Sequence, residues 1–448
     1  MHAIEKAIRC DSPYTEYQKN KPMRIRRWFG WETLLGFSMY GSTLRALPIP
    51  GDYVWGGVLT TYVIAISGLF LSVFKNGIKI PFRIAIFSLC FAALFLWCII
   101  TLLWSPISVS QLVKGDLYII SNVVIPTFAL AIGRNRKIFL ERRWVVGVVL
   151  AIFIISCYCL FLWVISPESL YATLLEHAIE DTTLSGIYLA VGQALMAFSI
   201  VSFIWGVYAS HLNKTAIVIS TLVFWLAIES GARGPVICGI LTILIFLIIN
   251  FFYGKKITIM YWLILVFILV IIPTVVWLVF LNIDFLTDHL PFLSRFYSDS
   301  LRGYDDLSSI GMRLSYYHRA LFLFFEQPFF GQGVLSFRAL SNLDSIYPHN
   351  YFLDALGDLG LVGFFLSISL ISFGLVACWH ITVTGDRISQ KICAALFVYF
   401  FGMEMSSGYF YWSWVWPWTI VVIQAQPQIR KRRSRQKVLT QDGSCDWY

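Results

Sequence analysis

Long uncharged apolar runs recur along most of the chain, and short polar segments containing Gly, Pro or charged residues separate them. A helix needs about 20 apolar residues to cross a hydrocarbon layer of about 30 Å, and many of these runs have that length. The pattern therefore predicts about twelve transmembrane helices. They lie at residues 29–47, 54–74, 84–104, 117–133, 144–165, 185–208, 215–229, 234–253, 257–281, 349–380, 392–409 and 412–426, of which 349–380 is too long for one span.

Composition agrees with this pattern. Of the 448 residues, 58% are hydrophobic and only 13% are charged, whereas soluble domains carry about 25% charged residues. A soluble protein is excluded, and the fold class is an all-α integral membrane protein. Most of the nine cysteines lie inside apolar runs, so they are interpreted as small hydrophobic residues and not as a disulfide framework.

The basic residues predict the orientation in the membrane. Short cytoplasmic loops hold an excess of Lys and Arg, and most of the 34 such residues fall on one side if the number of spans is even and both termini are cytoplasmic. The net charge of +9 then reflects this bias and the basic tails. No nucleic-acid binding is implied, although the basic run at 430–437 could contact anionic membrane lipids.

These spans divide the chain into a cytoplasmic tail (1–28), helices 1–9 (29–281), a large periplasmic loop (282–348), helices 10–12 (349–426) and a basic cytoplasmic tail (427–448). One long loop on the outer face places function on that face. A transporter is the alternative from another class. Transporters usually hold charge near the bilayer midplane. Apart from Arg45, near the outer end of the first predicted span, no Lys or Arg lies inside a predicted span, which disfavours this alternative.

Several arginines lie on the outer side, against the charge bias. Arg233 sits in the Ser-Gly-Ala-Arg-Gly-Pro break at 230–235, where it could either turn toward a cavity or reach lipid headgroups. Arg313 and Arg319 open an amphipathic helix that continues to Pro328. Six residues correspond to 600° of helical rotation, so the two arginines are not expected to serve identical roles, and Arg319 is also compatible with a solvated loop charge.

A second cluster of polar and small residues follows. Phe-Phe-Gly-Gln-Gly occupies 329–333, and His349 and Asn350 stand where the outer loop enters the long apolar run. A histidine at a helix start is often a capping or packing residue. At a membrane–water boundary, however, a neutral imidazole could also act as a base.

Taken together, these motifs resemble those of the O-antigen ligase family, within the wider superfamily of O-antigen ligases and polymerases. The resemblance rests on His349-Asn350 followed after nine residues by Gly360-Leu-Val-Gly363, on the Arg-Gly break at Arg233, and on the Gly-x-Arg run at Arg313 with its following Gly-Gln-Gly. It covers roughly residues 180–380. One departure is Tyr316 or Tyr317 at a position after Arg313 that is often Trp in the family.

The resemblance implies a metal-independent membrane glycosyltransferase without cofactors, in the bacterial inner membrane with its active site facing the periplasm. It would move a glycan from undecaprenyl diphosphate to an acceptor hydroxyl. His349 would be the catalytic base, Arg233 and Arg313 would hold the diphosphate, and Arg319 is a further candidate. The supporting residues would be Asn350, Asp358, Gly360 and Gly363, with Asp358 placed either to orient a partner or simply in solvent.

Two questions stay open at this level. A ligase would pass the polymer to lipid A-core, whereas a polymerase would pass it to the next lipid-linked repeat unit. The His-Asn-x9-Gly-x-x-Gly spacing favours the ligase. Asp305-Asp306 could suggest a metal-binding carboxylate pair, but no third ligand stands at a suitable spacing.

Overall fold

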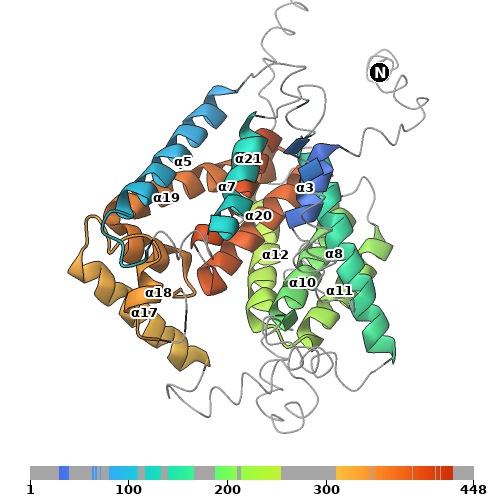
Figure 1. The fold of residues 1–448 in the computed structure, drawn as a ribbon. Coiled ribbons are helices and arrows are strands. Elements are labelled where there is room, and N and C mark those ends of the chain that lie inside the picture. Colours follow the sequence, from blue (N-terminus) through green and yellow to red (C-terminus); the bar gives the residue numbers. More distant parts are fainter. Residues whose placement is uncertain are drawn as a thin grey trace, which may run out of the picture.

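The computed structural model describes residues 30–39, 63–64, 66–67, 71, 80–108, 117–132, 140–165, 187–208, 213–253, 309–343, 345, 347–385, 387–408, 410–413 and 415–426. Over these residues the protein is helical and contains no β-strand (Figure 1). The predicted all-α class is confirmed for this part. The elements are α3 (Trp31–Met39), α5 (Phe82–Thr101), α7 (Leu117–Ile132), α8 (Leu140–Ile165), α10 (Ile187–Tyr208), α11 (Lys214–Glu229), α12 (Arg233–Tyr253), α17 (Ser309–Glu326), α18 (Ser336–Leu340), α19 (Tyr351–Thr384), α20 (Ile388–Ser407), η6 (Phe410–Trp412) and α21 (Val415–Ala425).

Six helices in the described part are long and apolar enough to cross a membrane: α5, α8, α10, α12, α19 and α20. The protein is therefore a multi-pass membrane protein. The predicted spans at 54–74 and 257–281 lie largely or wholly outside the described residues, as do the two tails. The number of twelve spans and the orientation stay predictions.

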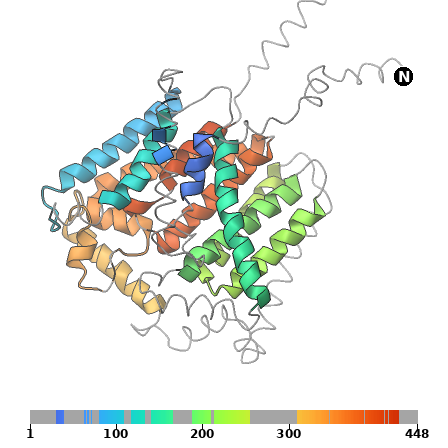
Figure 2. The ribbon, with the colours of Figure 1, turned by 45° about the vertical axis from the view of Figure 1, so that its right-hand side comes forward.

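The three C-terminal helices occupy the centre of the bundle. α19, α20 and α21 pack on one another, with α5 and α7 on one side and α8, α10 and α12 on the other (Figures 1 and 2). Large aromatic side chains fill this centre, and Trp416, Trp418 and Phe397 are almost completely buried. Outward-facing side chains such as Leu89 and Phe161 are apolar and exposed, which is the pattern of helices that face lipid.

At the N-terminal side, α3 and α8 cross closely. A Cβ atom on Gly147 would lie 2.0 Å from the Thr33 carbonyl oxygen, and one on Gly36 would lie 2.6 Å from that of Trp144. The approach brings Arg143 within 2.8 Å of Glu32 in a buried ion pair. The sequence placed Arg143 in the loop before a span at 144, but it lies in the first turn of α8, where the carboxylate compensates the buried charge.

The predicted amphipathic helix after Arg313 is confirmed as α17, which ends two residues before Pro328. Proline disfavours helical geometry in the residue before it, which explains the position of this end. The long apolar run at 349–380 forms α19, whose backbone is interrupted at Gly360 (φ 65°, ψ −164°). This kink explains how a run longer than one span is accommodated.

Candidate functional site

His349 lies at the entrance of α19 in an unusual backbone conformation. Its φ is 57°, in the left-handed region that only a few per cent of non-glycine residues adopt, although Asn, Asp and His do so more often than the others. The next residue fixes the helix start, because the Asn350 side-chain oxygen accepts hydrogen bonds from the backbone N–H groups of Phe352 and Leu353, both at 3.1 Å. The histidine is thus held in a strained position directly before a firmly capped helix.

Two tyrosines enclose the His349 imidazole. The ring of Tyr316, from α17, stacks on it at a centroid distance of 5.7 Å, and the ring of Tyr347 lies 4.3 Å away. Its Nδ1 atom is buried and has no hydrogen-bond partner among the described residues. An unpaired buried nitrogen costs free energy, so packing stability alone does not explain a histidine at this position.

Burial and, to a smaller extent, the positive charge of Arg313 together lower the pKa of His349 from 6.5 to about 4. The imidazole is therefore neutral at pH 7 and can accept a proton. The neighbouring Tyr347 behaves oppositely, because burial, and then the charges of Glu404 and Asp354, raise its pKa to about 12. Tyr347 therefore keeps its proton at pH 7.

Arg313 reaches the C-terminal end of α20. Its guanidinium donates to the Ser406 carbonyl oxygen at 2.8 Å and to the Ser407 hydroxyl at 3.4 Å. Asn350 donates to the neighbouring Met405 carbonyl oxygen at 2.9 Å. The last carbonyl groups of a helix have no partner within it and carry partial negative charge. Capping this helix end is therefore one role of Arg313, and it leaves other N–H groups of the guanidinium for a ligand.

The start of α12 adjoins the same helix end. Gly231 adopts a φ of 69° in the break that precedes Arg233, and Arg233 is the first residue of α12. A Cβ atom on Gly234 would lie 3.6 Å from the Ser406 hydroxyl oxygen. The structure thus brings three predicted elements together around the end of α20: the start of α12 with Arg233, the start of α17 with Arg313, and the start of α19 with His349.

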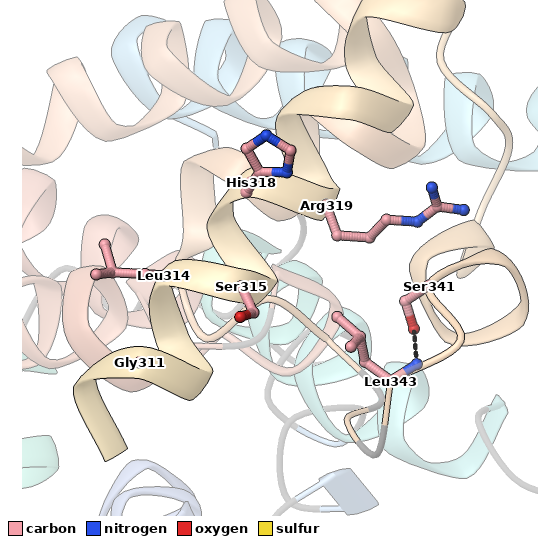
Figure 3. Close-up of a pocket in the computed structure, with 7 residues that line it drawn as sticks. All are labelled: Gly311, Leu314, Ser315, His318, Arg319, Ser341 and Leu343. Carbon is pink, nitrogen blue, oxygen red and sulfur yellow. Dashed lines mark hydrogen bonds between the residues drawn. The ribbon is translucent and has the colours of Figure 1, made fainter. Parts of the chain in front are cut away.

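Arg319 lies elsewhere on α17. Its guanidinium donates from Nε to the Leu340 carbonyl oxygen at 3.1 Å and again from Nη2, and it lies 5.0 Å from the centre of the Phe322 ring. With His318 and Ser341 it lines an open hollow of about 400 Å³ between α17 and the segment after α18 (Figure 3). The predicted difference between Arg313 and Arg319 agrees with these contacts, which tie Arg319 to the loop.

Asp358 is fully enclosed, which does not fit the solvated carboxylate considered from the sequence. It accepts hydrogen bonds from the Ser336 hydroxyl at 2.6 Å, the Phe337 backbone N–H at 3.0 Å and the Tyr411 hydroxyl at 3.0 Å. One carboxylate thus joins α19 to α18 and to η6. The other alternative considered from the sequence was that Asp358 orients a partner. The groups that it holds in place here belong to other elements of the same chain.

The glycines of the two motifs interlock beside it. Gly331 has a φ of 74° and Gly360 a φ of 65°, and a Cβ atom on Gly331 would lie 2.3 Å from the Asp358 carbonyl oxygen. The Gly333 N–H donates to that same oxygen at 2.9 Å, and the Leu361 N–H donates to Pro328 at 2.9 Å. Only glycine fits such a close backbone approach. Gly363 is restricted more locally, since a Cβ atom there would meet Leu359 at 2.2 Å.

Some contributing residues were missed from the sequence. Tyr316 and Tyr347 flank His349, and Ser406 lies where the predicted elements meet. The sequence names Tyr316 only as one of two alternatives, with Tyr317, for an aromatic position after Arg313. Its spacing of three residues places it on the same side of a helix as Arg313, which is a signal for its part in the site. Nothing in the sequence marks the end of α20 as their meeting point.

Within the described part of the chain, no group of three or more His, Cys, Asp or Glu residues could hold a metal ion. Asp305 and Asp306 lie outside that part, so the absence of a metal stays a prediction.

The comparisons with known proteins can now be set beside this geometry. Residues 216–368 match a family model described as O-Antigen ligase. The matched segment includes Arg233, Arg313 and the start of α19 with His349, which confirms the resemblance based on the motifs. A search of curated proteins finds no match to this chain.

Proposed function

We propose that this multi-pass membrane protein, which carries an O-antigen ligase domain over residues 216–368, is a glycosyltransferase of O-antigen synthesis. In the proposed reaction it moves a glycan from undecaprenyl diphosphate to an acceptor hydroxyl. The acceptor that we propose is lipid A-core. The chain would lie in the bacterial inner membrane, with this site facing the periplasm. The observation that carries the proposal is the meeting of the starts of α12, α17 and α19, which bear Arg233, Arg313 and His349, around the end of α20.

The acceptor hydroxyl would be activated by His349. A sugar hydroxyl is a poor nucleophile until a base removes its proton. The imidazole takes this proton while the acceptor oxygen bonds to the anomeric carbon and the bond from that carbon to the diphosphate oxygen breaks. The bonding electrons leave with the diphosphate, so negative charge grows on its oxygen in the transition state.

Arg313 and Arg233 would stabilise that charge. Guanidinium groups bind phosphate oxygens in a bidentate manner, and they do so more strongly in a site shielded from water. The N-terminus of α12, at which Arg233 lies, adds a positive dipole end, which favours anions. No metal ion is needed for this charge balance.

The closeness of Arg313 and His349 also determines that donor binding comes before proton transfer to His349. Without a donor, the charge of Arg313 opposes protonation of His349. A diphosphate bound to Arg313 would offset this charge and raise the proton affinity of the imidazole. His349 would therefore become an effective base only when the donor is bound. In the absence of donor it would stay unprotonated.

A polymerase remains the second candidate, because the same site would serve an acceptor that is the next lipid-linked repeat unit. Deletion of the gene followed by separation of surface glycans by size distinguishes the two. Loss of a ligase leaves unattached polymer, and loss of a polymerase leaves core that carries a single repeat. Unchanged glycans, with transport of a lipid-linked substrate lost instead, would overturn the proposal in favour of a transporter.

A further inference from the structure

The outward side of α17 is apolar and exposed. Phe325 is 72% accessible, and Leu314, Leu321 and Phe322 are exposed on the same side of the helix. Phe329 and Phe330 extend this surface directly after the helix end. We call these six residues the α17 apolar face. His318 is also exposed on this side, between Leu314 and Leu321, so the uninterrupted part of the apolar face runs from Leu321 to Phe330. An exposed apolar surface of this kind in a folded protein indicates a partner.

The opposite side of α17 faces the protein. Ala320 and Leu323 pack with Phe337 in a small core of their own, while Tyr316 stacks on His349. Arg313 lies on this side as well, because it binds the end of α20. The helix therefore separates an outward apolar face from an inward face that forms part of the candidate site.

The first turns of α17 lie at the end of a membrane span, since Arg313 contacts Ser406 and Ser407 in the last turn of α20. The segment after α17 lies at the end of another span. There the Gly331 carbonyl oxygen accepts a hydrogen bond from Trp104 at 3.0 Å, three residues beyond the end of α5. Phe330 also contacts Trp97 of α5, with a distance of 5.9 Å between ring centres.

These two span ends lie on the same side of the membrane. Trp97, near the end of α5, donates to the Leu359 carbonyl oxygen in the early part of α19 at 3.0 Å. The start of α19 is in turn joined to the end of α20 by the bond from Asn350 to Met405. A helix of 18 residues is about 27 Å long. Since both of its ends meet the same boundary, α17 must run along that boundary.

We propose that α17 lies flat in the membrane interface, with its apolar face in contact with the lipid acyl chains and its inward face at the His349 site. The apolar face adjoins α5 through the contact of Phe330 with Trp97, and the residues directly after α5 are also exposed, Leu103 at 84% and Trp104 at 37%. Aromatic side chains are favoured at this depth. Helices with one apolar face bind membranes in this orientation, and α17 is not among the described helices that could cross the bilayer.

This arrangement sets the depth of Arg313. A helix anchored in the interface holds the guanidinium at the level of the lipid phosphates, which is also where the diphosphate of a lipid-linked donor lies. The contact of α17 with lipid is inferred from the positions of the span ends alone. The idea that this contact places Arg313 at the depth of the donor diphosphate rests, in addition, on the proposed function.

Spin labels can test the lipid contact in the full-length protein reconstituted in liposomes. Phe325→Cys and Leu321→Cys would each be labelled in a background without the native cysteines. Leu103→Cys, two residues beyond the end of α5, serves as the lipid reference, and Ala339→Cys, exposed on α18, serves as the water reference. Collision rates with oxygen and with a water-soluble nickel complex then report the depth of each label.

We expect the labels at 325 and 321 to match the label at 103, with preferential access of oxygen. Access of the nickel complex equal to that at position 339 would overturn the proposal, as would spin–spin coupling between copies, which would mean that a second copy covers this face. The readout does not depend on transfer, so it can be interpreted even if the proposed reaction is absent.

A transfer assay tests whether α17 sets the depth of Arg313 in the membrane. Phe325→Asp places a charge in the acyl region and should lower kcat/KM for the lipid-linked donor about tenfold, whereas Ala339→Asp should leave it unchanged. Equal activity of the two variants would overturn the role of α17 in setting the depth of the site.

Discussion

Two regions of α19, about ten residues apart, use their polar groups in opposite ways. At the kink, the Asp358 carboxylate accepts three hydrogen bonds, and the facing glycines adopt positive φ angles that suit them. At the helix start, His349 adopts a positive φ that does not suit it, and its buried Nδ1 has no partner among the described residues.

This difference distinguishes residues that maintain the fold from residues that are kept for another reason, although both kinds belong to one sequence motif. Satisfied hydrogen bonds and well-placed glycines stabilise a fold. A strained residue with an unpaired buried atom weakens the fold and persists where another requirement maintains it. We therefore assign Asp358, Gly360 and Gly363 to the architecture of the site, and His349 with its arginines to the reaction.

Apart from the loss of transfer on replacement of His349 itself, the largest effect is expected from the arginines. Arg313→Lys and Arg233→Lys keep the charge but lose the planar fork that binds phosphate oxygens, so each should reduce the transfer rate about a hundredfold, equivalent to about 3 kcal/mol of transition-state stabilisation. Steady-state transfer by purified variants measures this. Arg338→Lys, on the exposed surface of α18, is the matched control and should be near neutral. Equal losses in all three would indicate a diffuse basic surface.

The next effect concerns the kink. Gly331→Ala would place a Cβ atom 2.3 Å from a backbone oxygen at a φ of 74°, and we expect a destabilisation of about 2 kcal/mol. Thermal unfolding in detergent would show it as a lower Tm. Gly402→Ala is the control, since a Cβ there would lie 3.5 Å from Cys238 in ordinary contact. If Gly331→Ala left both stability and transfer unchanged, the assignment of the kink to architecture would be wrong.

A smaller effect is expected on stability at His349. Asn tolerates a positive φ better than other residues with side chains, so His349→Asn should leave Tm unchanged or slightly raised. Asn350→Ala, by contrast, removes the α19 cap and should cost about 1 kcal/mol. A loss of stability in His349→Asn as large as that in Gly331→Ala would mean that the histidine is a structural residue.

The smallest effect is expected from metal removal. Since guanidinium groups balance the charge of the leaving diphosphate in the proposed mechanism, transfer should continue at an unchanged rate in excess chelator. Asp305→Ala combined with Asp306→Ala should remain active in the same assay. Activity that chelator abolishes and magnesium or manganese restores would contradict this.

Much of the fold could be predicted, because apolar runs bounded by charge follow directly from the requirement to cross a lipid bilayer. The sequence also predicted the helix α17, and it marked Arg313 and His349 as candidate site residues because both lie in recognisable motifs. It could not predict the meeting of three helix starts at Ser406, because tertiary packing brings together residues far apart in the chain. The enclosure of Asp358 was missed for the same reason: its partners Ser336 and Tyr411 belong to other elements.

The most direct test of the assignment of His349 compares donor binding with transfer in purified His349→Asn and wild-type protein, using a lipid-linked glycan donor and its acceptor. A general base contributes about 10²- to 10⁴-fold to rate. We therefore predict an unchanged Kd for the donor, because Arg233 and Arg313 remain, together with a loss of transfer of about a thousandfold. Transfer at the wild-type rate in the folded variant would contradict the role of His349 as the base.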